Sequence, residues 1–468
     1  LARTYVEEVT LGQLIGWAVH GIYRQLSEKV PTEVANQLAS IKDVKEEELK
    51  TFLMQTRKLL GNRNDLKENK ATNIALARMT RTLDPYTTYI SPEDLAAFKK
   101  DTSGQFSGIG VQVREDEKTK RLLIITPLKG GPALEAGFQA GDLILQIIRE
   151  VDSKGNKLDK PEIIDTKDLS ITKAVKKITG KKGTKVKLKI ARKLPDGKKV
   201  IEKIIEVARG DIKVETVMGA RRQESTEWDF MLDSKDKIGY IRLTQFNPSS
   251  TGEMVRAMRA LKKQGMKALV LDLRFNPGGL LYSAKEIADL FIDDGLLVLI
   301  RRGKGRPGIM TGFSDGSYLD FPMVCLVNGG SASGSEIVAA ALQDQRRAVV
   351  VGSRSFGKGS VQTINDLGTA QIKVTTATFW RPNGENLNKM STKGRDEDTW
   401  GVKPNPGYSL KLSRSEQREL LEYHSKVEII HPKGTKPKKL DFKDKQLEIG
   451  LRYLREQLQL AAKAPKKK

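Results

Sequence analysis

The chain reads Val327-Asn-Gly-Gly-Ser-Ala-Ser-Gly-Ser-Glu336 where a continuously apolar run, Met323–Val327, meets a segment of helical spacing, Ser335–Asp344. A tight turn between a buried strand and a helix exposes one side chain at the strand's carboxyl end. It also aims the free N–H groups of the helix at the same spot. The turn holds three serines, and any of them can instead act only as the helix N-cap, with Glu336 favourable in the first turn.

The same alternation of strand and helix recurs on both sides of this turn. The apolar patterns predict strands at 238–243, 268–273, 323–327 and 348–351, and helices at 251–264, 281–293 and 335–344. Such alternation predicts a largely parallel α/β core over residues 212–406. Sites in folds of this kind lie at the carboxyl ends of the strands.

Two further motifs follow strands of this predicted sheet. Leu271-Asp-Leu-Arg-Phe-Asn-Pro-Gly-Gly-Leu280 places paired glycines after a buried strand, which leaves backbone N–H groups unobstructed for an oxyanion or simply makes a turn. Gly352-Ser-Arg-Ser-Phe-Gly-Lys-Gly-Ser-Val-Gln362 comes close to a phosphate-binding loop. It has Gly359 in place of the magnesium-binding hydroxyl, and a strand pattern follows instead of a helix, so nucleotide hydrolysis is disfavoured.

The histidines and the cysteine restrict the chemistry further. The 468 residues predict two to four domains, yet the three histidines are His20, His424 and His431, so residues 21–423 contain none. One cysteine, Cys325, excludes an intrachain disulfide and a multi-thiolate zinc site. A serine–lysine pair is the remaining hydrolytic chemistry.

That chemistry requires a neutral lysine at the working pH. Lowering its pKa from about 10.4 to about 7–8 takes on the order of 4 kcal/mol, which burial of the amine can supply. We expect Phe356 and the neighbouring apolar strands to bury Lys358. Gln362 lies four residues further on and shares a face with Lys358 if the segment is extended.

Together the three motifs resemble the carboxyl-terminal processing proteases, the tail-specific serine peptidases of family S41. The resemblance rests on Ser331-Ala-Ser-Gly-Ser-Glu-Ile337, Phe356-Gly-Lys-Gly-Ser-Val-Gln362 and Leu271–Gly279, with Leu83-Asp-Pro-Tyr-Thr-Thr-Tyr-Ile90 matching the segment that precedes the PDZ domain of the family. It implies that Ser333 is the nucleophile, Lys358 the general base and Gln362 the residue that positions the base. It also implies oxyanion-hole N–H groups at Gly334, Gly278 and Gly279, and no cofactor or metal.

Residues 104–211 resemble the PDZ domain of that family. Phe106-Ser-Gly-Ile-Gly-Val111 resembles its carboxylate-binding loop, in which the N–H groups around Gly108, Ile109 and Gly110 form an anion nest. Residues 172–178 are expected to form the helix on the other side of the peptide groove. Arg192 is a candidate sensor that couples the bound carboxylate to the active site. The alternative is that these glycines only make a hairpin.

The resemblance implies a multidomain α+β architecture. Its parts are a helical region at 1–103, of which 70–103 pack on the core, the PDZ domain at 104–211, and a crotonase/ClpP-like α/β core at 212–406. A C-terminal helical region at 407–468 ends in a basic tail. Protein substrates with free C-termini are the expected partners, and the helical ends are expected to mediate self-association or contacts with an adaptor. The family also implies export to the periplasm or cell envelope, with the signal peptide absent from this chain.

Two other functions fit parts of the sequence. A PDZ scaffold that has lost catalysis fits the binding loop, although every catalytic position is filled. The excess of 82 basic over 58 acidic residues, a net charge of +24, suggests a nucleic-acid binder. The basic residues are spread out and lack an aromatic stacking platform, so contact with an anionic cell envelope explains the charge better than specific nucleic-acid recognition.

Overall fold

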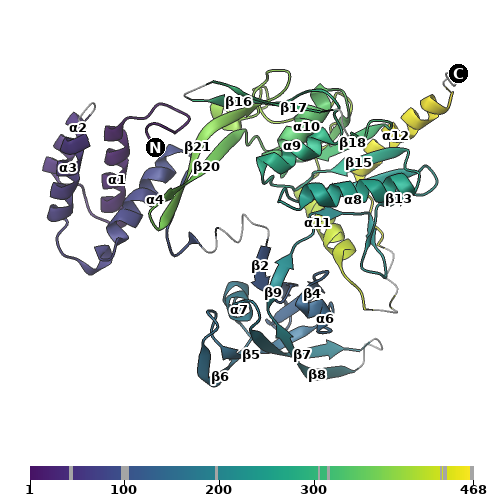
Figure 1. Ribbon diagram of the computed structural model, residues 1–468, viewed down its shortest axis with the longest axis horizontal. Coiled ribbons are helices and arrows are strands. Elements are labelled where there is room, and N and C mark those ends of the chain that lie inside the picture. The colour runs from purple at the N-terminus through teal and green to yellow at the C-terminus, as the bar shows by residue number, and fades with distance from the viewer. Residues whose placement is uncertain are drawn as a thin grey trace.

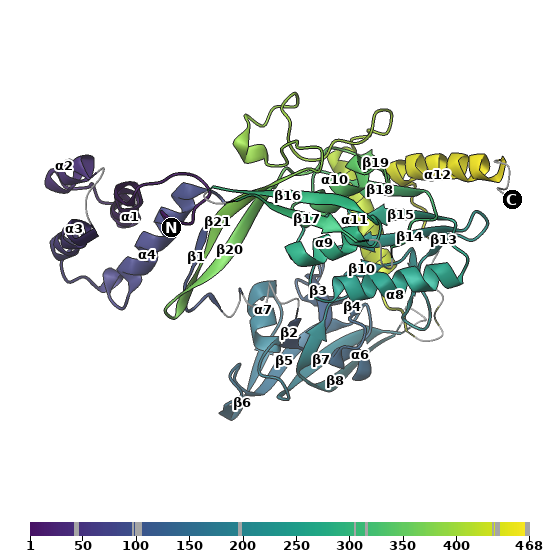
Figure 2. The same ribbon diagram turned by 45° about the horizontal axis from the view of Figure 1, so that its top comes forward.

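The computed structural model describes residues 1–41, 46–95, 98, 105–194, 199–303, 306–313, 317–432, 435 and 440–463 (Figure 1). Residues 464–468 of the expected basic tail lie outside these residues. Helices of the N-terminal region stand at one end, a long β-hairpin leads from them to the core, and the strand-rich unit lies beside the core (Figures 1 and 2).

The central sheet has the predicted parallel strands. Strands β14 (Ile238–Leu243), β15 (Ala268–Asp272), β18 (Met323–Val327) and β19 (Val349–Gly352) pair in parallel in that order. Antiparallel strands β10 (Val217–Met218) and β13 (Met231–Asp233) pair with β14 at the edge. The four parallel strands confirm the strand predictions to within one residue, because most of their residues are buried and apolar.

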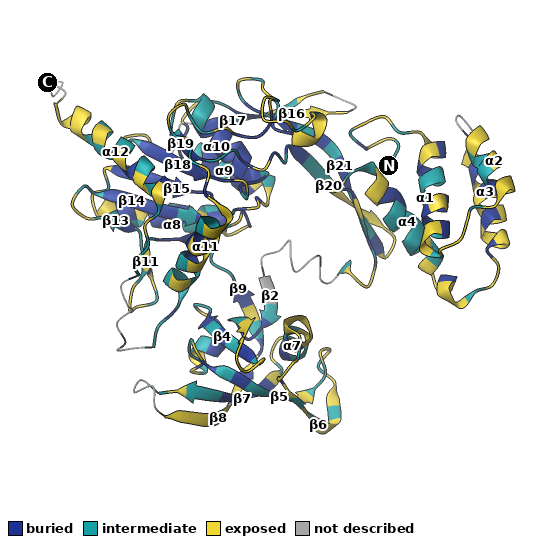
Figure 3. Ribbon diagram, turned by 180° about the vertical axis from the view of Figure 1, so that it is seen from behind, coloured by how far each residue is buried: buried dark blue, intermediate teal, exposed yellow. Residues whose placement is uncertain are grey.

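Helices cover both faces of this sheet, whose strands are the most deeply buried part of the chain (Figure 3). On one face lie α8 (Ser250–Lys263), α9 (Leu281–Asp289) and α10 (Gly334–Asp344), close to their predicted positions. On the other lie α12 (Lys445–Lys463) and, beside it, α11 (Arg414–Glu428). Leu451 and Leu454 of α12 pack on the sheet, so this helix contributes to the core.

A second, antiparallel sheet extends from the core to the N-terminal helices. It contains β1 (Thr88–Ile90), β16 (Gly295–Arg302), β17 (Gly308–Gly312), β20 (Ser360–Leu367) and β21 (Ala370–Trp380). Strand β21 is central, with β1, β16 and β20 as partners. The pairing of β1 with β21 places residues 88–90 on this sheet.

The described part of the N-terminal region is largely helical. Its elements are α1 (Leu11–Gln25), α2 (Thr32–Ser40), α3 (Glu46–Leu59), the short η1 (Asn64–Leu66) and α4 (Lys70–Leu83). They share a small apolar core of their own. Among the described residues, no helix combines the length and hydropathy that crossing a membrane requires.

Residues 105–213 form a strand-rich unit with its own apolar core. Its sheet has the order β3 (Val111–Glu115), β4 (Leu122–Pro127), β5 (Leu143–Val151), β7 (Lys185–Lys193), β8 (Val200–Ala208), with β6 (Lys157–Asp165) also on β5. Helices α6 (Pro132–Glu135) and α7 (Ile171–Ile178) accompany the sheet. The chain enters through β2 (Gln105–Gly108) and leaves through β9 (Gly210–Lys213), which pair with each other.

Three small elements complete the description. Strands β11 (Arg221–Arg222) and β12 (Trp228–Asp229) form a two-stranded ribbon, and η2 (Lys389–Ser391) is a single short turn of helix.

Candidate active site

The three serines of the turn after β18 have different environments. Ser331 Oγ donates to Leu273 O at 2.8 Å and Ser335 Oγ to Asn276 O at 2.9 Å, and both residues are fully buried. Ser333 is partly exposed and has φ 54° and ψ −113°, a conformation that a non-glycine residue rarely adopts. Ser333 lines a pocket, whereas Ser331 and Ser335 hydrogen-bond the turn to the loop after β15.

That second loop, residues 273–280, lies directly against Ser333. Ala332 N donates to Asn276 O at 3.0 Å. Gly278 has φ +93°, and a Cβ there would lie 2.7 Å from both Ser333 Cβ and Ala332 O. A side chain at this position would therefore push the two loops apart, so the close approach requires glycine.

Glu336 joins the turn to the glycine loop that carries Lys358. Its carboxylate is fully buried and accepts four hydrogen bonds, from the N–H groups of Ser333 and Lys358 at 2.8 Å, and from Gly357 N and Ser355 Oγ at 2.6 Å. Burial raises the pKa of Glu336, and these four hydrogen bonds oppose that rise. The sequence indicated only a favourable charge in the first helical turn, although the Ser-x-x-Glu spacing is that of a capping box.

Lys358 follows β19 and precedes β20. Burial lowers the pKa of Lys358, the positive charge of Lys373 lowers it further, and the negative charge of Glu336 opposes both. Phe356, which was expected to bury the amine, is 49% exposed and lines a different cavity, so that prediction was wrong. The aromatic neighbour is instead Tyr86, whose ring centroid lies 4.7 Å from Lys358 Nζ.

Gln362 lies on β20, opposite Thr375 of β21. Its Nε2 donates to Ser360 Oγ at 2.9 Å and to Thr375 Oγ1 at 3.2 Å. Within the described residues, no hydrogen bond joins Lys358 Nζ to Gln362 or to the Ser333 hydroxyl. The side chains of Ser333, Lys358 and Gln362 therefore line one pocket, but the hydrogen bonds that proton transfer needs are not formed.

A pocket of about 340 Å³ collects the residues that the sequence indicated. Ser333, Gly334, Gly278, Gly279, Lys358 and Gln362 all line it, together with apolar side chains such as Leu281, Ile337 and Phe379. The N–H of Gly278 donates to Asn276 Oδ1 at 2.9 Å, so this group is already engaged. Gly334, at the first position of α10, and Gly279 are therefore the better placed of the three predicted oxyanion donors.

A buried ionic network supports the loop after β15 from behind. Arg274 donates to Asp272 Oδ2 and to Asp444 Oδ2, each at 2.6 Å, and Tyr240 donates to Asp272 at 2.8 Å. The neighbouring Arg274 charge and its hydrogen bonds outweigh burial and lower the pKa of Asp272 to about 2. The network ties the loop to residue 444, just ahead of α12.

The loop predicted to bind a carboxylate lies between β2 and β3. Gly110 has φ +74°, Ile109 is buried, and Gly108 is the last residue of β2. Helix α7 covers the predicted segment 172–178 and contacts β3, which follows the loop. These positions are compatible with a peptide groove between β3 and α7.

Arg192 has a different partner from the one expected. Its guanidinium donates to both carboxylate oxygens of buried Asp142 at 2.6 Å and to Gly137 O at 2.8 Å. Release of this pair would leave a buried charge, which is costly. In this structure Arg192 pairs with Asp142 inside the strand-rich unit, and this geometry does not support a role as carboxylate sensor.

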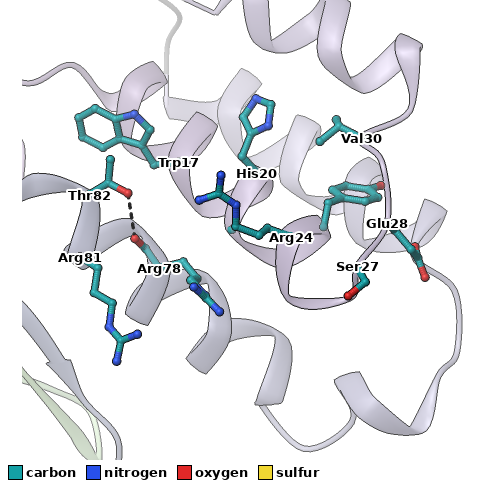
Figure 4. A pocket seen from close by; sticks show the side chains of 11 residues that line it. Trp17, His20, Arg24, Ser27, Glu28, Val30, Arg78, Arg81 and Thr82 are labelled. Atoms are coloured by element: carbon teal, nitrogen blue, oxygen red, sulfur yellow. Dashed lines mark hydrogen bonds between the residues drawn. The ribbon is translucent and has the colours of Figure 1, made fainter.

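Two larger cavities lie outside this pocket. One of about 730 Å³ between α1 and α4 is lined by Trp17, His20 and several arginines (Figure 4). Another of about 720 Å³ is lined by Tyr86, Phe356 and residues of the 386–400 loop. This loop packs on the glycine loop, because Lys389 N donates to Gly357 O at 2.9 Å. Neither cavity contains Ser333, so volume alone does not locate the chemistry.

Comparison with known proteins shows the family of the chain. Residues 237–405 match the model of peptidase family S41. The carboxyl-terminal-processing protease of Picosynechococcus sp. is 36% identical over 310 residues, 66% of this chain and 68% of that protein. The carboxy-terminal-processing protease of Bartonella bacilliformis is 34% identical over 361 residues, 75% of each chain. A solved structure described as photosystem II D1 C-terminal processing protease covers 86% of this chain and 94% of its own, with 28% identity and a TM-score of 0.42. The chain therefore belongs to peptidase family S41, in the group of carboxyl-terminal processing proteases.

Proposed function

We propose that this protein is a serine endopeptidase in which Ser333 attacks the scissile carbonyl and Lys358 is the general base. The observation that carries the proposal is the convergence of three loops on one pocket of about 340 Å³ that contains both side chains. Ser333 is the partly exposed serine of its turn, and the pKa of Lys358 is lowered by burial. A neutral amine at the working pH can take the serine proton, which a normal lysine cannot.

The first step forms an acyl-enzyme. The neutral Lys358 amine takes the proton of the Ser333 hydroxyl as Oγ bonds to the carbonyl carbon, and the resulting ammonium then protonates the leaving amine. The N–H groups of Gly334 and Gly279 stabilise the oxyanion of the tetrahedral intermediate. Water then hydrolyses the ester, with Lys358 again acting as base.

Gln362 positions the base in this mechanism. Both N–H groups of its amide are directed at Ser360 and Thr375, so the carbonyl oxygen is the atom that can accept from the Lys358 amine. Within the described residues no hydrogen bond joins Lys358 Nζ to Ser333 or Gln362, and catalytic contacts commonly tighten when substrate binds.

The 105–213 unit is proposed to be an inserted PDZ domain that binds the free C-terminus of a protein substrate, on a crotonase/ClpP-like core. The loop around Gly110 supplies backbone donors, and the strand after it can pair with an extended peptide. By the same family analogy, the protein acts in the periplasm or at the cell envelope and associates with itself or an adaptor through its helical ends.

The experiment compares two peptides of one sequence, one with a free and one with an amidated C-terminus. The amidated peptide should be cut about 10- to 150-fold less efficiently in kcat/KM, because a charge-assisted contact is lost. Ser333→Ala should cut neither peptide while still binding the free one. Equal rates for both peptides would overturn tail recognition, and cleavage by Ser333→Ala would overturn the proposed nucleophile. Peptide binding without cleavage by the unmodified protein would favour a silent scaffold.

A further inference from the structure

We propose that Tyr86, in the segment Leu83–Ile90 that connects the N-terminal helices to the core, is a positioning residue for the Lys358 amine. The proposal rests on the proposed serine–lysine mechanism and extends it to a residue outside the three catalytic motifs. Its central observation is the contact between Lys358 Nζ and the Tyr86 ring, 4.7 Å from the ring centroid. The segment crosses from α4 to β1, and Tyr86 lines the neighbouring cavity of about 720 Å³.

Hydrogen bonds hold Tyr86 in a fixed backbone turn. Asp84 Oδ1 accepts from the N–H groups of Tyr86 at 2.7 Å and Thr87 at 2.9 Å, and Asp84 Oδ2 accepts from Thr87 Oγ1 at 2.7 Å. This is an Asx-type turn, which fixes the direction of the residues that follow the aspartate. Thr87 is buried, so these bonds are shielded from water.

The same turn is bonded to the strand that faces Gln362. Thr375 N donates to Thr87 Oγ1 at 3.0 Å, and Thr375 Oγ1 donates to Asp84 Oδ1 at 3.2 Å while accepting from Gln362 Nε2 at 3.2 Å. One threonine hydroxyl therefore links the turn to the amide that is proposed to orient the base. Tyr86, which contacts the Lys358 amine, and Gln362, which lines the same pocket as Lys358, thus come from two elements that share this hydrogen-bonded frame.

An aromatic ring suits a lysine that must lose its proton. A carboxylate beside the amine would strongly favour the ammonium form and raise its pKa, which defeats a general base. A ring face attracts the ammonium more weakly and also excludes water from it. Among the described residues, the contributions to the Lys358 environment come from burial, Lys373 and Glu336, and no carboxylate forms an ion pair with Nζ. Tyr86 thus gives the amine a defined place without a strong counter-charge.

The test uses three variants of the full chain. Tyr86→Leu keeps apolar volume but removes the ring face, Tyr86→Phe restores the ring without the hydroxyl, and Tyr89→Leu is a matched control. Tyr89 lies in the same segment, but its hydroxyl donates to Asn73 Oδ1 at 2.8 Å, away from Lys358. Each variant is assayed for kcat and KM on a free C-terminal peptide. The pH dependence of Lys358 acetylation by acetic anhydride is measured by peptide mass spectrometry.

Tyr86→Leu should lower kcat about 10- to 100-fold with KM changed less than about threefold, because misplacement of a catalytic group affects the chemical step. It should also displace the midpoint of Lys358 acetylation by about half a pH unit or more. Tyr86→Phe should recover most of the kcat, and Tyr89→Leu should match the unmodified protein. An unchanged kcat and midpoint in Tyr86→Leu, or an equal loss in Tyr89→Leu, would overturn the inference. If Lys358→Ala retains activity, the proposed mechanism itself fails, and the acetylation midpoints still show whether Tyr86 acts on the amine.

Discussion

Replacing Glu336 by glutamine changes one oxygen of a buried carboxylate to an NH₂ group. That carboxylate hydrogen-bonds both the turn that holds Ser333 and the loop that holds Lys358. The carboxylate oxygens each accept two hydrogen bonds, whereas glutamine presents an NH₂ group to one of the two pairs of donors. Two hydrogen bonds to a charged acceptor are then lost, at about 1.5–3 kcal/mol each. Relief of the cost of burying a charge, which raises the pKa of Glu336, offsets part of the loss. We expect a net loss of roughly 2–3 kcal/mol, concentrated where Ser333 and Lys358 are held together.

The assay measures kcat on a C-terminal peptide together with the melting temperature. Glu336→Gln should lower kcat about 100-fold or more, because displacement of a catalytic loop by about 1 Å has effects of that size, and it should lower the melting temperature by several degrees. The matched control is Glu416→Gln in the capping box of α11, where Ser413 N donates to Glu416 at 2.7 Å and neither residue lines the pocket. The control should leave kcat unchanged. A kcat within threefold of the unmodified protein in Glu336→Gln would refute the role assigned to this carboxylate.

Three further predictions concern the neighbouring groups. Ser335→Ala should retain at least about a tenth of the activity, because it removes one buried hydrogen bond of about 1 kcal/mol, and complete inactivity would mean that Ser335 is the nucleophile. Lys358→Arg should be as inactive as Lys358→Ala, since a guanidinium keeps its proton, and the activity of the unmodified protein should rise with pH through the lowered pKa of Lys358. An acid limb that persists unshifted in an active Lys358→Arg protein would contradict this assignment. Burial lowers the pKa of His424 to about 3, so between about pH 6.5 and 3 the unfolded chain binds a proton that the folded chain does not. The free energy of unfolding should therefore fall as the pH drops through that window, by up to about 4–5 kcal/mol. His424→Leu should flatten this dependence in urea unfolding at several pH values, and an unchanged slope would contradict it.

The sequence predicted the parallel core well because each of its strands is a short apolar run between turn signals. Strand β18 and the start of α10 fell where the turn at 327–336 placed them, to within one residue. The convergence of the three motifs followed from strand order alone, since the carboxyl ends of parallel strands share one edge. The chain thus specifies most of the pocket through local patterns.

The contacts that the sequence did not reveal are between segments far apart in the chain. Tyr86 meets Lys358 from a position 272 residues earlier, and no local period signals that contact. Phe356 lies two residues from Lys358, but its side chain lines the cavity that Tyr86 also lines, whereas Lys358 lines the pocket that contains Ser333. Arg192 pairs with Asp142 because its strand β7 runs beside β5, a partner that only the register reveals.

The most direct test of the serine–lysine mechanism is to locate the acyl group during turnover. A peptide ester substrate is mixed with the protein, the reaction is quenched in acid after milliseconds, and the digested protein is mapped by mass spectrometry. The mechanism predicts an acyl adduct on Ser333 that is absent from Ser333→Ala and fails to accumulate in Lys358→Ala. An adduct on another residue, or rapid cleavage by Ser333→Ala, would contradict it.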